Sequence, residues 1–314
     1  MEKLLEVKDL KVSFFTDLGE TQAVKGAGFA IGEGDFFGIV GESGSGKSVT
    51  TKSILRLGPS NCKIMGGEIL FRGEDILKKN EAELREIRGG EIAMIFQDSL
   101  SALNPVYTVG NKMVELIRRH TNMNKKEAKA RVLELLTAVG ITDPEKAMNS
   151  YPHELSGGMR QRVMIAMAMS SDPKVLIADE PTTALDVTIQ AQILHLLLEL
   201  QKKNNMSIIL ITHDLGVVAQ TCKRVAVMCG GYVVEEVFLH PGHPYTQALI
   251  ASMPRVGGTF EQFLERDLSD GNGDLCPFLN RCKYADKTCE ACLPKYYEAS
   301  EGHRIFCHKR EEKR

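Results

Sequence analysis

Residues 36–48 read Phe36-Phe37-Gly38-Ile39-Val40-Gly41-Glu42-Ser43-Gly44-Ser45-Gly46-Lys47-Ser48. The apolar start of this stretch is typical of a strand buried in a parallel sheet. Its remainder fits the pattern G-x4-G-K-[S/T], and residues 48–57, which overlap its end, have the apolar spacing of a helix. A flexible Gly/Ser turn is the alternative, but the order strand, loop, helix is the context that a phosphate-binding loop requires.

This loop predicts a site for the phosphates of a nucleotide. Glycines allow the backbone to curl so that successive N–H groups point at an anion, and the helix N-terminus adds a partial positive charge. We expect Lys47 to reach the β- and γ-phosphates and Ser48 to bind Mg²⁺. The other residues that we assign to the nucleotide site here are Gly41, Ser43, Gly44, Ser45, Gly46 and Thr50.

Length and composition limit the class of protein. The chain has 314 residues, with 39 Lys and Arg against 41 Asp and Glu and a formal net charge of −2. This length suggests about two domains, and the near-neutral balance argues against a dedicated nucleic-acid-binding protein. No apolar run approaches the roughly 20 residues that cross a membrane. Residues 1–7 lack the layout of a secretory signal, so we expect a cytosolic chain.

Short apolar runs alternate with amphipathic segments along the chain. The predicted strands are 92–96, 174–178 and 207–212, and the predicted helices are 109–120, 125–139 and 189–203. This order indicates an α/β core of parallel strands with a helical insertion. Residues 225–234 predict a closing hairpin that turns at Gly230 and Gly231.

Two of the predicted strands end in polar residues that suit phosphoryl transfer. The run 175–180 ends in Asp179 and Glu180, and ligands of open α/β sheets bind at that end of the strands. We assign Asp179 to Mg²⁺ and Glu180 to the attacking water, as its general base or orienting group. His213 follows the run 208–212 and is a candidate contact to the γ-phosphate, although a lone His is more often structural.

Residues 155–162 read Leu155-Ser156-Gly157-Gly158-Met159-Arg160-Gln161-Arg162 and resemble the signature motif of ATP-binding-cassette (ABC) ATPases. In this family the signature motif binds the γ-phosphate of ATP held by a partner subunit, so two subunits enclose two ATP molecules. The resemblance therefore implies that Ser156, Gly157 and Gly158 contact ATP across a dimer interface.

The other motifs follow the order of this family. Gln97 resembles the Q-loop glutamine, which implies a Mg²⁺ ligand and a catalytic residue. Residues 183–186 resemble the D-loop, which places Asp186 at the nucleotide, and His213 resembles the catalytic histidine of the H-loop. Phe14 resembles the aromatic residue that stacks on adenine; an ordinary core aromatic, and Phe15 as the stacking residue, stay open.

Further stretches resemble the ATPase subunits of bacterial dipeptide/oligopeptide importers, the peptide/nickel subfamily. They are residues 94–98, 101–105, 185–192, 213–219 and 243–246. The implied fold is a P-loop RecA-like α/β core with an N-terminal antiparallel β subdomain and a helical signature subdomain. We expect this nucleotide-binding domain at 1–235, with its helical part at about 98–165, and a small Cys-rich extension at 236–314.

The resemblance implies an ATP-hydrolysing subunit that energises import of dipeptides or oligopeptides from the cytoplasmic face of the cell membrane. The implied partners are two transmembrane permease subunits, docking on about 98–160, a second ATPase subunit and, indirectly, an extracytoplasmic substrate-binding protein; nucleic acid is not among them. A paralogous second ATPase subunit is favoured, and a homodimer stays open. Import of nickel or another small solute, or a soluble ABC ATPase without a transport role, are the alternatives.

Five of the eight cysteines lie between Cys276 and Cys307. Cytosolic thiols stay reduced, so this cluster indicates metal binding before disulfides. From the residues alone, structural Zn²⁺ with Cys289 and Cys292 as one pair of ligands, and unmetallated or disulfide-bonded cysteines, stay open. The C-terminal pattern of the family implies a [4Fe–4S] cluster on Cys276, Cys282, Cys289 and Cys307, with Cys292 as the spare or alternative ligand.

The remaining signals outside the motifs are weaker. Residues 245–252 predict a short helix, and residues 257–273 are polar and loop-like. Cys62, Cys222 and Cys229 are scattered along the sequence, and we expect them to behave as small buried hydrophobic residues.

Overall fold

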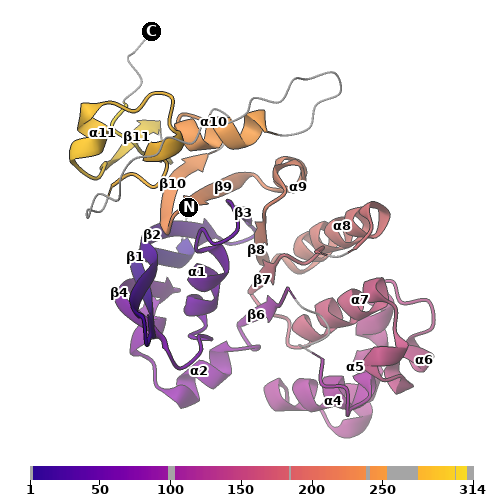
Figure 1. The fold of residues 1–314 in the computed structure, drawn as a ribbon. Helices are drawn as coiled ribbons and strands as arrows, with labels where there is room; N and C mark the ends of the chain where they lie inside the picture. Colours follow the sequence, from indigo (N-terminus) through magenta and orange to yellow (C-terminus); the bar gives the residue numbers. More distant parts are fainter. Residues whose placement is uncertain are drawn as a thin grey trace. The chain divides into compact units, whose positions relative to one another are not determined.

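The structure is a computed structural model that describes residues 3–97, 103–183, 185–237, 241–252, 275–300 and 302–309. The chain divides into two compact units, each built from segments far apart in the sequence (Figure 1). Of the described residues, the first unit contains those of 32–36 and 78–211, and the second contains those of 3–31, 37–77 and 212–309. The loop that we predict at 257–273 lies outside the described residues.

Three parallel strands form the sheet of the first unit. They are β6 (Ile92–Ile95), β7 (Val175–Asp179) and β8 (Ser207–Thr212). β7 lies in the middle: Ala178 pairs with Ile95 of β6, and Asp179 pairs with Ile211 of β8. Every residue of β7 and β8 is buried, which explains why these strands read as unbroken apolar runs.

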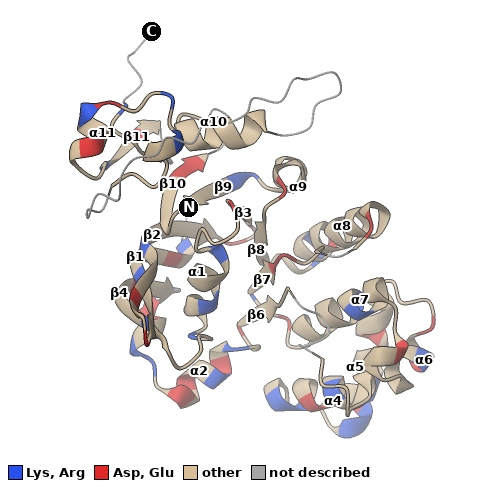
Figure 2. Ribbon diagram, viewed as in Figure 1, with Lys and Arg blue, Asp and Glu red and all other residues tan. Residues whose placement is uncertain are grey.

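The helices of the first unit begin at residues with local capping chemistry. They are α2 (Glu81–Ile87), α4 (Val109–His120), α5 (Lys125–Ala138), α6 (Pro144–Asn149), α7 (Gly157–Ala168) and α8 (Val187–Asn204), with a short 3₁₀ turn at Pro152–Glu154. Thr108 caps α4, and Asn124 forms a capping box with Glu127 at the start of α5. The last turn of α4 is basic, as the helix dipole favours (Figure 2). The predicted helical insertion is confirmed.

The second unit contains an antiparallel sheet near the N-terminus. Its strands are β1 (Lys3–Thr16), β2 (Gly19–Gly32), β4 (Cys62–Phe71) and β5 (Glu74–Asp75), in the order β2-β1-β4-β5. A 3₁₀ turn at Ile76–Lys78 follows β5. β1 pairs antiparallel with β4 from Leu5 opposite Phe71 to Phe14 opposite Cys62. This sheet corresponds to the expected N-terminal β subdomain.

The second unit also holds residues 37–40 of the strand at 36–40. β3 (Phe36–Val40) pairs in parallel with β9 (Arg224–Cys229), and the order continues to β10 (Tyr232–Val237), β12 (His303–Phe306) and β11 (Tyr296–Ser300). Its helices are α1 (Lys47–Ile54), α9 (Leu215–Thr221), α10 (Pro244–Ala251) and α11 (Lys287–Ala291), with a 3₁₀ turn at Leu279–Arg281. The C-terminal strands thus extend the sheet that carries β3.

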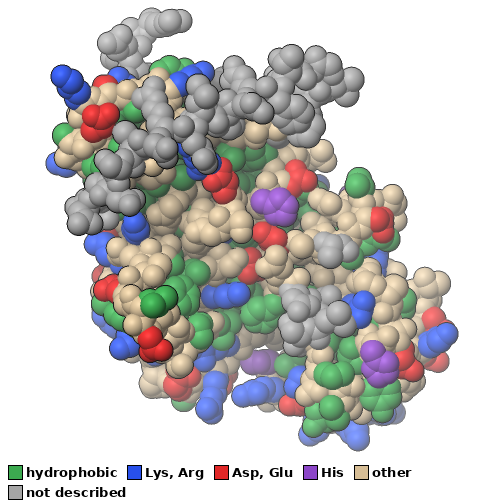
Figure 3. Space-filling model, viewed as in Figure 1, with side chains coloured by type: hydrophobic (Ala, Val, Ile, Leu, Met, Phe, Trp, Pro, Cys, Tyr) green, Lys and Arg blue, Asp and Glu red, His purple; other side chains and the backbone are tan. Residues whose placement is uncertain are grey.

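The fold class that the sequence predicts is confirmed. β9 and β10 form the expected hairpin, and Gly230 and Gly231 both have positive φ, at 51° and 89°. Within the described residues, no helix has the length and apolar character needed to cross a bilayer. On the face drawn in Figure 3, acidic and basic side chains are interspersed.

Candidate functional site

The loop between β3 and α1 has a backbone that only glycine accommodates at its two ends. Gly41 has a φ of 154° and Gly46 a φ of 100°. A Cβ at Gly41 would collide with the carbonyl oxygen of Met228 in β9, and one at Gly46 would lie 2.7 Å from the carbonyl oxygen of Ala23. The glycines therefore allow the loop to pass close to two neighbouring backbones.

Lys47 lies inside this loop and is only 5% exposed. Its Nζ donates to the carbonyl oxygens of Gly41, at 2.7 Å, and of Glu42, at 2.8 Å. Ser48 is half-buried in the first turn of α1. Thr50 is fully buried, and its hydroxyl contacts the sulfur of Met228 at 3.9 Å.

In the first unit, carboxylates follow the buried strand β7. Asp179 is its last residue and is 1% exposed. Glu180 has a φ of 46°, in the left-handed region that non-glycine residues rarely adopt. Its N–H donates to the carbonyl oxygen of Ile211 at 2.9 Å, so β8 holds the strained residue in place.

Two side chains orient the Glu180 carboxylate. Its Oε2 accepts one hydrogen bond from Nε2 of Gln97 and one from the hydroxyl of Thr183, each at 2.9 Å. Gln97 follows β6, which pairs with β7, so the sheet register brings it to Asp179 and Glu180. Charge-assisted hydrogen bonds of this kind fix the direction of a carboxylate.

The residues of the signature-like stretch start a helix. Ser156 caps α7, and its hydroxyl accepts a hydrogen bond from the N–H of Met159 at 3.3 Å. Gly157 and Gly158 form the first turn of α7. Asp186 caps α8 in the same way, accepting from the N–H of Ile189 at 3.0 Å. Ser156 and Gly158 also line one open pocket of the first unit.

Phe14, Phe15 and His213 belong to the second unit. Phe14 is half-buried in β1, where its backbone pairs with Cys62. The ring of the neighbouring Phe15 lies 5.2 Å from the ammonium of Lys63, which gives Phe15 a cation–π contact of its own. His213 directly follows β8 and is exposed.

Four cysteines of the extension line one small pocket of the second unit. They are Cys276, Cys282, Cys289 and Cys307. Phe278 and Leu279 line the same pocket. Burial raises the pKa of the Cys276 thiol to about 11. Cys292 does not line the pocket and is exposed, with its sulfur 3.9 Å from Nε2 of His308. In the described part of the chain, no three His, Cys, Asp or Glu side chains are grouped so as to hold a metal ion.

Sequence reasoning missed three functional contacts. Thr183 orients Glu180, and Tyr245 and Arg281 both bind Glu42 in the phosphate loop. One signal was available for Arg281: a carboxylate inside an anion-binding loop repels phosphates, so a nearby cation is expected. Nothing in the sequence shows which of the 39 Lys and Arg residues supplies that cation.

Comparison with known protein families gives two matches. Residues 24–183 match the family described as ABC transporter. Residues 233–289 match the family described as oligopeptide/dipeptide transporter, C-terminal region. The two matches cover the phosphate loop and the carboxylates in one case, and much of the extension in the other.

Similar proteins of known name extend along nearly the whole chain. The dipeptide transport ATP-binding protein DppD of Bacillus subtilis (strain 168) is 48% identical over 98% of this chain and 95% of its own. The oligopeptide transport ATP-binding protein OppD of the same organism is 50% identical over 96% of this chain and 88% of its own. DppD of Escherichia coli (strain K12) is 46% identical over 97% of this chain and 96% of its own.

Solved structures with a similar fold include the dimeric form of the bacterial ABC transporter cassette MJ0796. It superposes with a TM-score of 0.68 at 30% identity, covering 76% of this chain and 99% of that one. A post-hydrolysis dimer of the same cassette, bound to ADP and phosphate, gives the same values.

Proposed function

This chain belongs to the ABC transporter family of ATPases, and on that premise we propose that it is the ATP-hydrolysing subunit of a membrane importer for dipeptides or oligopeptides. The observation that carries the substrate class is the match of residues 233–289 to the C-terminal region of oligopeptide/dipeptide transporters. That region lies beyond the cassette match, which ends at residue 183. ATP hydrolysis alone would not separate this protein from other ABC ATPases.

The test is purification of the chain with its membrane subunits, followed by reconstitution in vesicles with the cognate binding protein. We expect ATP hydrolysis that rises on adding dipeptides or oligopeptides, together with their uptake. Stimulation by nickel but not by any peptide would reject the substrate class. Failure to copurify with any membrane protein, with ATPase activity intact, would reject the transport role.

We assign the hydrolytic roles by the chemistry of each side chain. Phosphoryl transfer to water needs positioning and charge neutralisation more than covalent chemistry. The loop amides and Lys47 would bind the phosphates, with Lys47 exchanging its bonds to Gly41 and Glu42 for phosphate oxygens. Glu180 would orient the attacking water and accept its proton. His213 would contact the γ-phosphate.

Mg²⁺ fits the donor set assigned to it. Ser48, Gln97 and Asp179 offer hydroxyl, amide and carboxylate oxygens, the ligands that Mg²⁺ prefers beside phosphates. Bound Mg²⁺ would neutralise part of the phosphate charge. Burial of Asp179 at the end of β7 supports a role in cation binding, because a buried carboxylate favours a positively charged partner.

The active assembly in this proposal contains a second ATPase subunit and two permease subunits, at the cytoplasmic face of the cell membrane. Ser156, Gly157 and Gly158 would bind the ATP of the second subunit through the N-terminal end of α7, with Asp186 at the same interface. Each hydrolytic site would then be complete only on closure of the dimer. A paralogous second subunit is our first expectation, with the extracytoplasmic binding protein acting through the permeases.

The extension is proposed to hold a [4Fe–4S] cluster on Cys276, Cys282, Cys289 and Cys307. Support comes from the pocket that these four residues line and from its apolar walls. The exposed position of Cys292, outside that pocket, supports its role as the spare cysteine. A single Zn²⁺ bound by cysteines of the same segment is the alternative.

Spectroscopy of anaerobically purified full-length protein tests this part of the proposal. We expect the protein to absorb at about 400 nm and to contain iron and acid-labile sulfide, as proteins with cysteine-bound clusters do. Cys282→Ser should lose both, and Cys292→Ser should keep both. Colourless protein that contains zinc would reject the cluster.

A further inference from the structure

Glu42, the second residue of the phosphate loop, is bound by a residue of the C-terminal extension. Nη1 of Arg281 donates to its Oε1 at 2.8 Å, and Nη2 donates to its Oε2 at 2.9 Å. This is a bidentate pair between residues 239 positions apart. Such pairs fix geometry as well as charge, because two parallel hydrogen bonds hold the planes of both groups together.

The backbone of Glu42 is held as well. Its N–H donates to the hydroxyl of Tyr245 at 3.0 Å, and Tyr245 is only 1% exposed. Its carbonyl oxygen accepts from Nζ of Lys47 at 2.8 Å. One loop residue therefore has its side chain, its N–H and its carbonyl oxygen all engaged, the first two by residues from outside the cassette match.

Arg281 is itself held by aromatic rings. Its guanidinium carbon lies 5.3 Å from the ring centre of Phe278 and 6.0 Å from that of Tyr245. The two rings meet edge to face with centres 5.3 Å apart. Packing of this kind restricts the side chain before any ligand binds.

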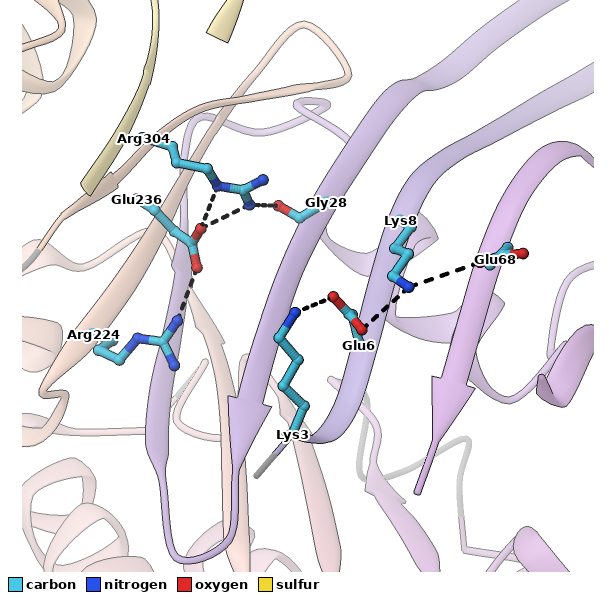
Figure 4. Close-up of polar contacts among 8 residues, drawn as sticks. All are labelled: Lys3, Glu6, Lys8, Gly28, Glu68, Arg224, Glu236 and Arg304. Atoms are coloured by element: carbon cyan, nitrogen blue, oxygen red, sulfur yellow. Dashed lines mark hydrogen bonds and ion pairs between the residues drawn. The ribbon is translucent and has the colours of Figure 1, made fainter. Parts of the chain in front are cut away.

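Strand β12, which follows the segment of Arg281 in the extension, is fixed to the cassette strands (Figure 4). Glu236 of β10, 7% exposed at its side chain, binds Arg224 of β9 at 3.1 Å and Arg304 of β12 at 2.8 Å. Arg304 also donates to the carbonyl oxygen of Gly28 in β2 at 3.1 Å. Next to this network, His303 binds the buried carboxylate of Glu235 at 2.7 Å.

A second contact joins the extension to the phosphate loop through the β9–β10 hairpin. The N–H of Gly231 donates to the carbonyl oxygen of Ser45 at 3.1 Å. A Cβ at Gly230 would lie 2.6 Å from Cβ of Pro277, the residue after Cys276. The extension therefore also contacts the loop indirectly, through this hairpin.

We propose that Arg281 and Tyr245 are positioning residues for ATP binding, which hold Glu42 so that the phosphate loop keeps its anion-binding shape. Pre-organising a loop strengthens binding because its ordering entropy is not lost when the ligand arrives. Arg281 also neutralises a carboxylate next to the site where phosphates bind. The inference rests on the nucleotide binding proposed above. It gives residues 243–246, and the segment between Cys276 and Cys282, a role at the phosphate loop.

The test measures the Kd of the full-length chain for a fluorescent ATP analogue, and KM and kcat for ATP in the assembled transporter. We expect Arg281→Ala to raise the Kd about fivefold and Tyr245→Phe about threefold, since each loses hydrogen bonds of ordinary strength. Arg281→Lys should give an intermediate Kd. In all three variants KM should rise while kcat stays within about twofold, as expected when binding alone is weakened.

Weaker ATP binding in Arg281→Ala could also come from loss of long-range attraction between Arg281 and the phosphates. The variant Glu42→Ala distinguishes this electrostatic explanation from loss of loop positioning. Loss of a negative charge next to the phosphates would tighten ATP binding by simple electrostatics, whereas loss of loop positioning weakens it. We expect Glu42→Ala to raise the Kd for the ATP analogue. The double variant Arg281→Ala with Glu42→Ala should have a Kd no higher than that of either single variant. Tighter binding by Glu42→Ala, with additive effects in the double variant, would overturn the proposal.

The matched control is Lys309→Ala. Lys309 forms an ion pair with Asp286 at 2.7 Å on the same extension, and it carries the same charge as Arg281. We expect an unchanged Kd for this variant; a rise equal to that of Arg281→Ala would assign the effect to general loss of charge or of extension stability. Wild-type protein without ATP affinity would reject the proposed function, whereas wild-type affinity in all variants would reject only this inference.

Discussion

The Gln97 side chain donates a hydrogen bond of 2.9 Å to Oε2 of Glu180, across 83 positions of sequence. Thr183 donates to the same oxygen at the same distance. The backbone of Glu180 is left-handed and is held by the carbonyl oxygen of Ile211. Two donors and a strained backbone thus fix the direction of this carboxylate, as its proposed role in orienting a water molecule requires.

Glu180→Gln should keep ATP binding and lower kcat by about 10²-fold or more, because the amide cannot accept a proton from water. ATP affinity and steady-state hydrolysis by the assembled transporter check this. Glu199→Gln removes an exposed carboxylate of α8 and should leave both unchanged. Turnover at the wild-type rate in Glu180→Gln would contradict the general-base role.

Thr183→Val should lower kcat about three- to tenfold with little change in KM, because one of the two donors to Glu180 is lost while the loop and its nucleotide contacts stay. Thr183→Ser retains the hydroxyl and should restore most of kcat. Equal reductions of kcat in Thr183→Ser and Thr183→Val would show that the hydroxyl does not contribute to hydrolysis.

Ser156→Ala should both destabilise α7 and impair the dimer. The cap of α7 depends on the Ser156 hydroxyl, and its loss costs about 1 kcal/mol in the free energy of unfolding. Thr108→Ala removes the cap of α4 and is the matched control. Denaturant unfolding should shift in both variants, whereas cooperativity of ATP hydrolysis should fall only in Ser156→Ala; equal cooperativity in both would leave Ser156 a capping residue alone.

Glu236→Ala should lower the free energy of unfolding by about 2–3 kcal/mol, because the arginines on either side lose a largely buried carboxylate. Glu68→Ala is the control in the same region: Glu68 is half-exposed and lies 3.9 Å from Lys8 (Figure 4). The control should change the free energy by less than about 0.5 kcal/mol. Urea unfolding with an unchanged m value in both variants would make the comparison valid.

The free energy of unfolding should fall as the pH rises above 9. Burial raises the pKa of Cys222 to about 11 and that of Cys229 to about 12, from an ordinary value of 9.0. A pKa that is higher in the folded state gives stability that is complete below pH 9 and is lost as pH approaches the folded value. The slope is at most about 1.4 kcal/mol per pH unit and group.

Unfolding of Cys222→Ala with Cys229→Ala at pH 8 and pH 10.5 tests this linkage. The double variant is less stable at both pH values but should show a shallower loss between them. Cys292→Ala removes an exposed thiol and is the control. An identical loss in the double variant and the wild type would assign the alkaline instability to other groups, such as Tyr296, whose pKa burial raises to about 12.

Local rules of sequence account for the phosphate loop and the elements around it. The glycines at 41 and 46 and the apolar run before them specify a strand, a curled loop and a helix, because backbone sterics act within a few residues. The meeting of Gln97 with Glu180 was also accessible, because buried parallel strands end at one edge. Helices α4 and α5 follow from apolar spacing and from their capping residues.

The partners of Glu42 and Glu180 required the folded chain. Arg281 and Tyr245 reach Glu42 from more than 200 positions away, and no periodicity or spacing in the sequence records that distance. Thr183 turns toward Glu180 only because a left-handed residue bends the backbone there. The sequence alone thus identified the cassette and predicted its nucleotide chemistry and its cysteine ligands, since these depend on residue type and local spacing. Tertiary packing alone determined which side chains orient those groups, because contacts between distant residues form only where the sheets and the extension meet.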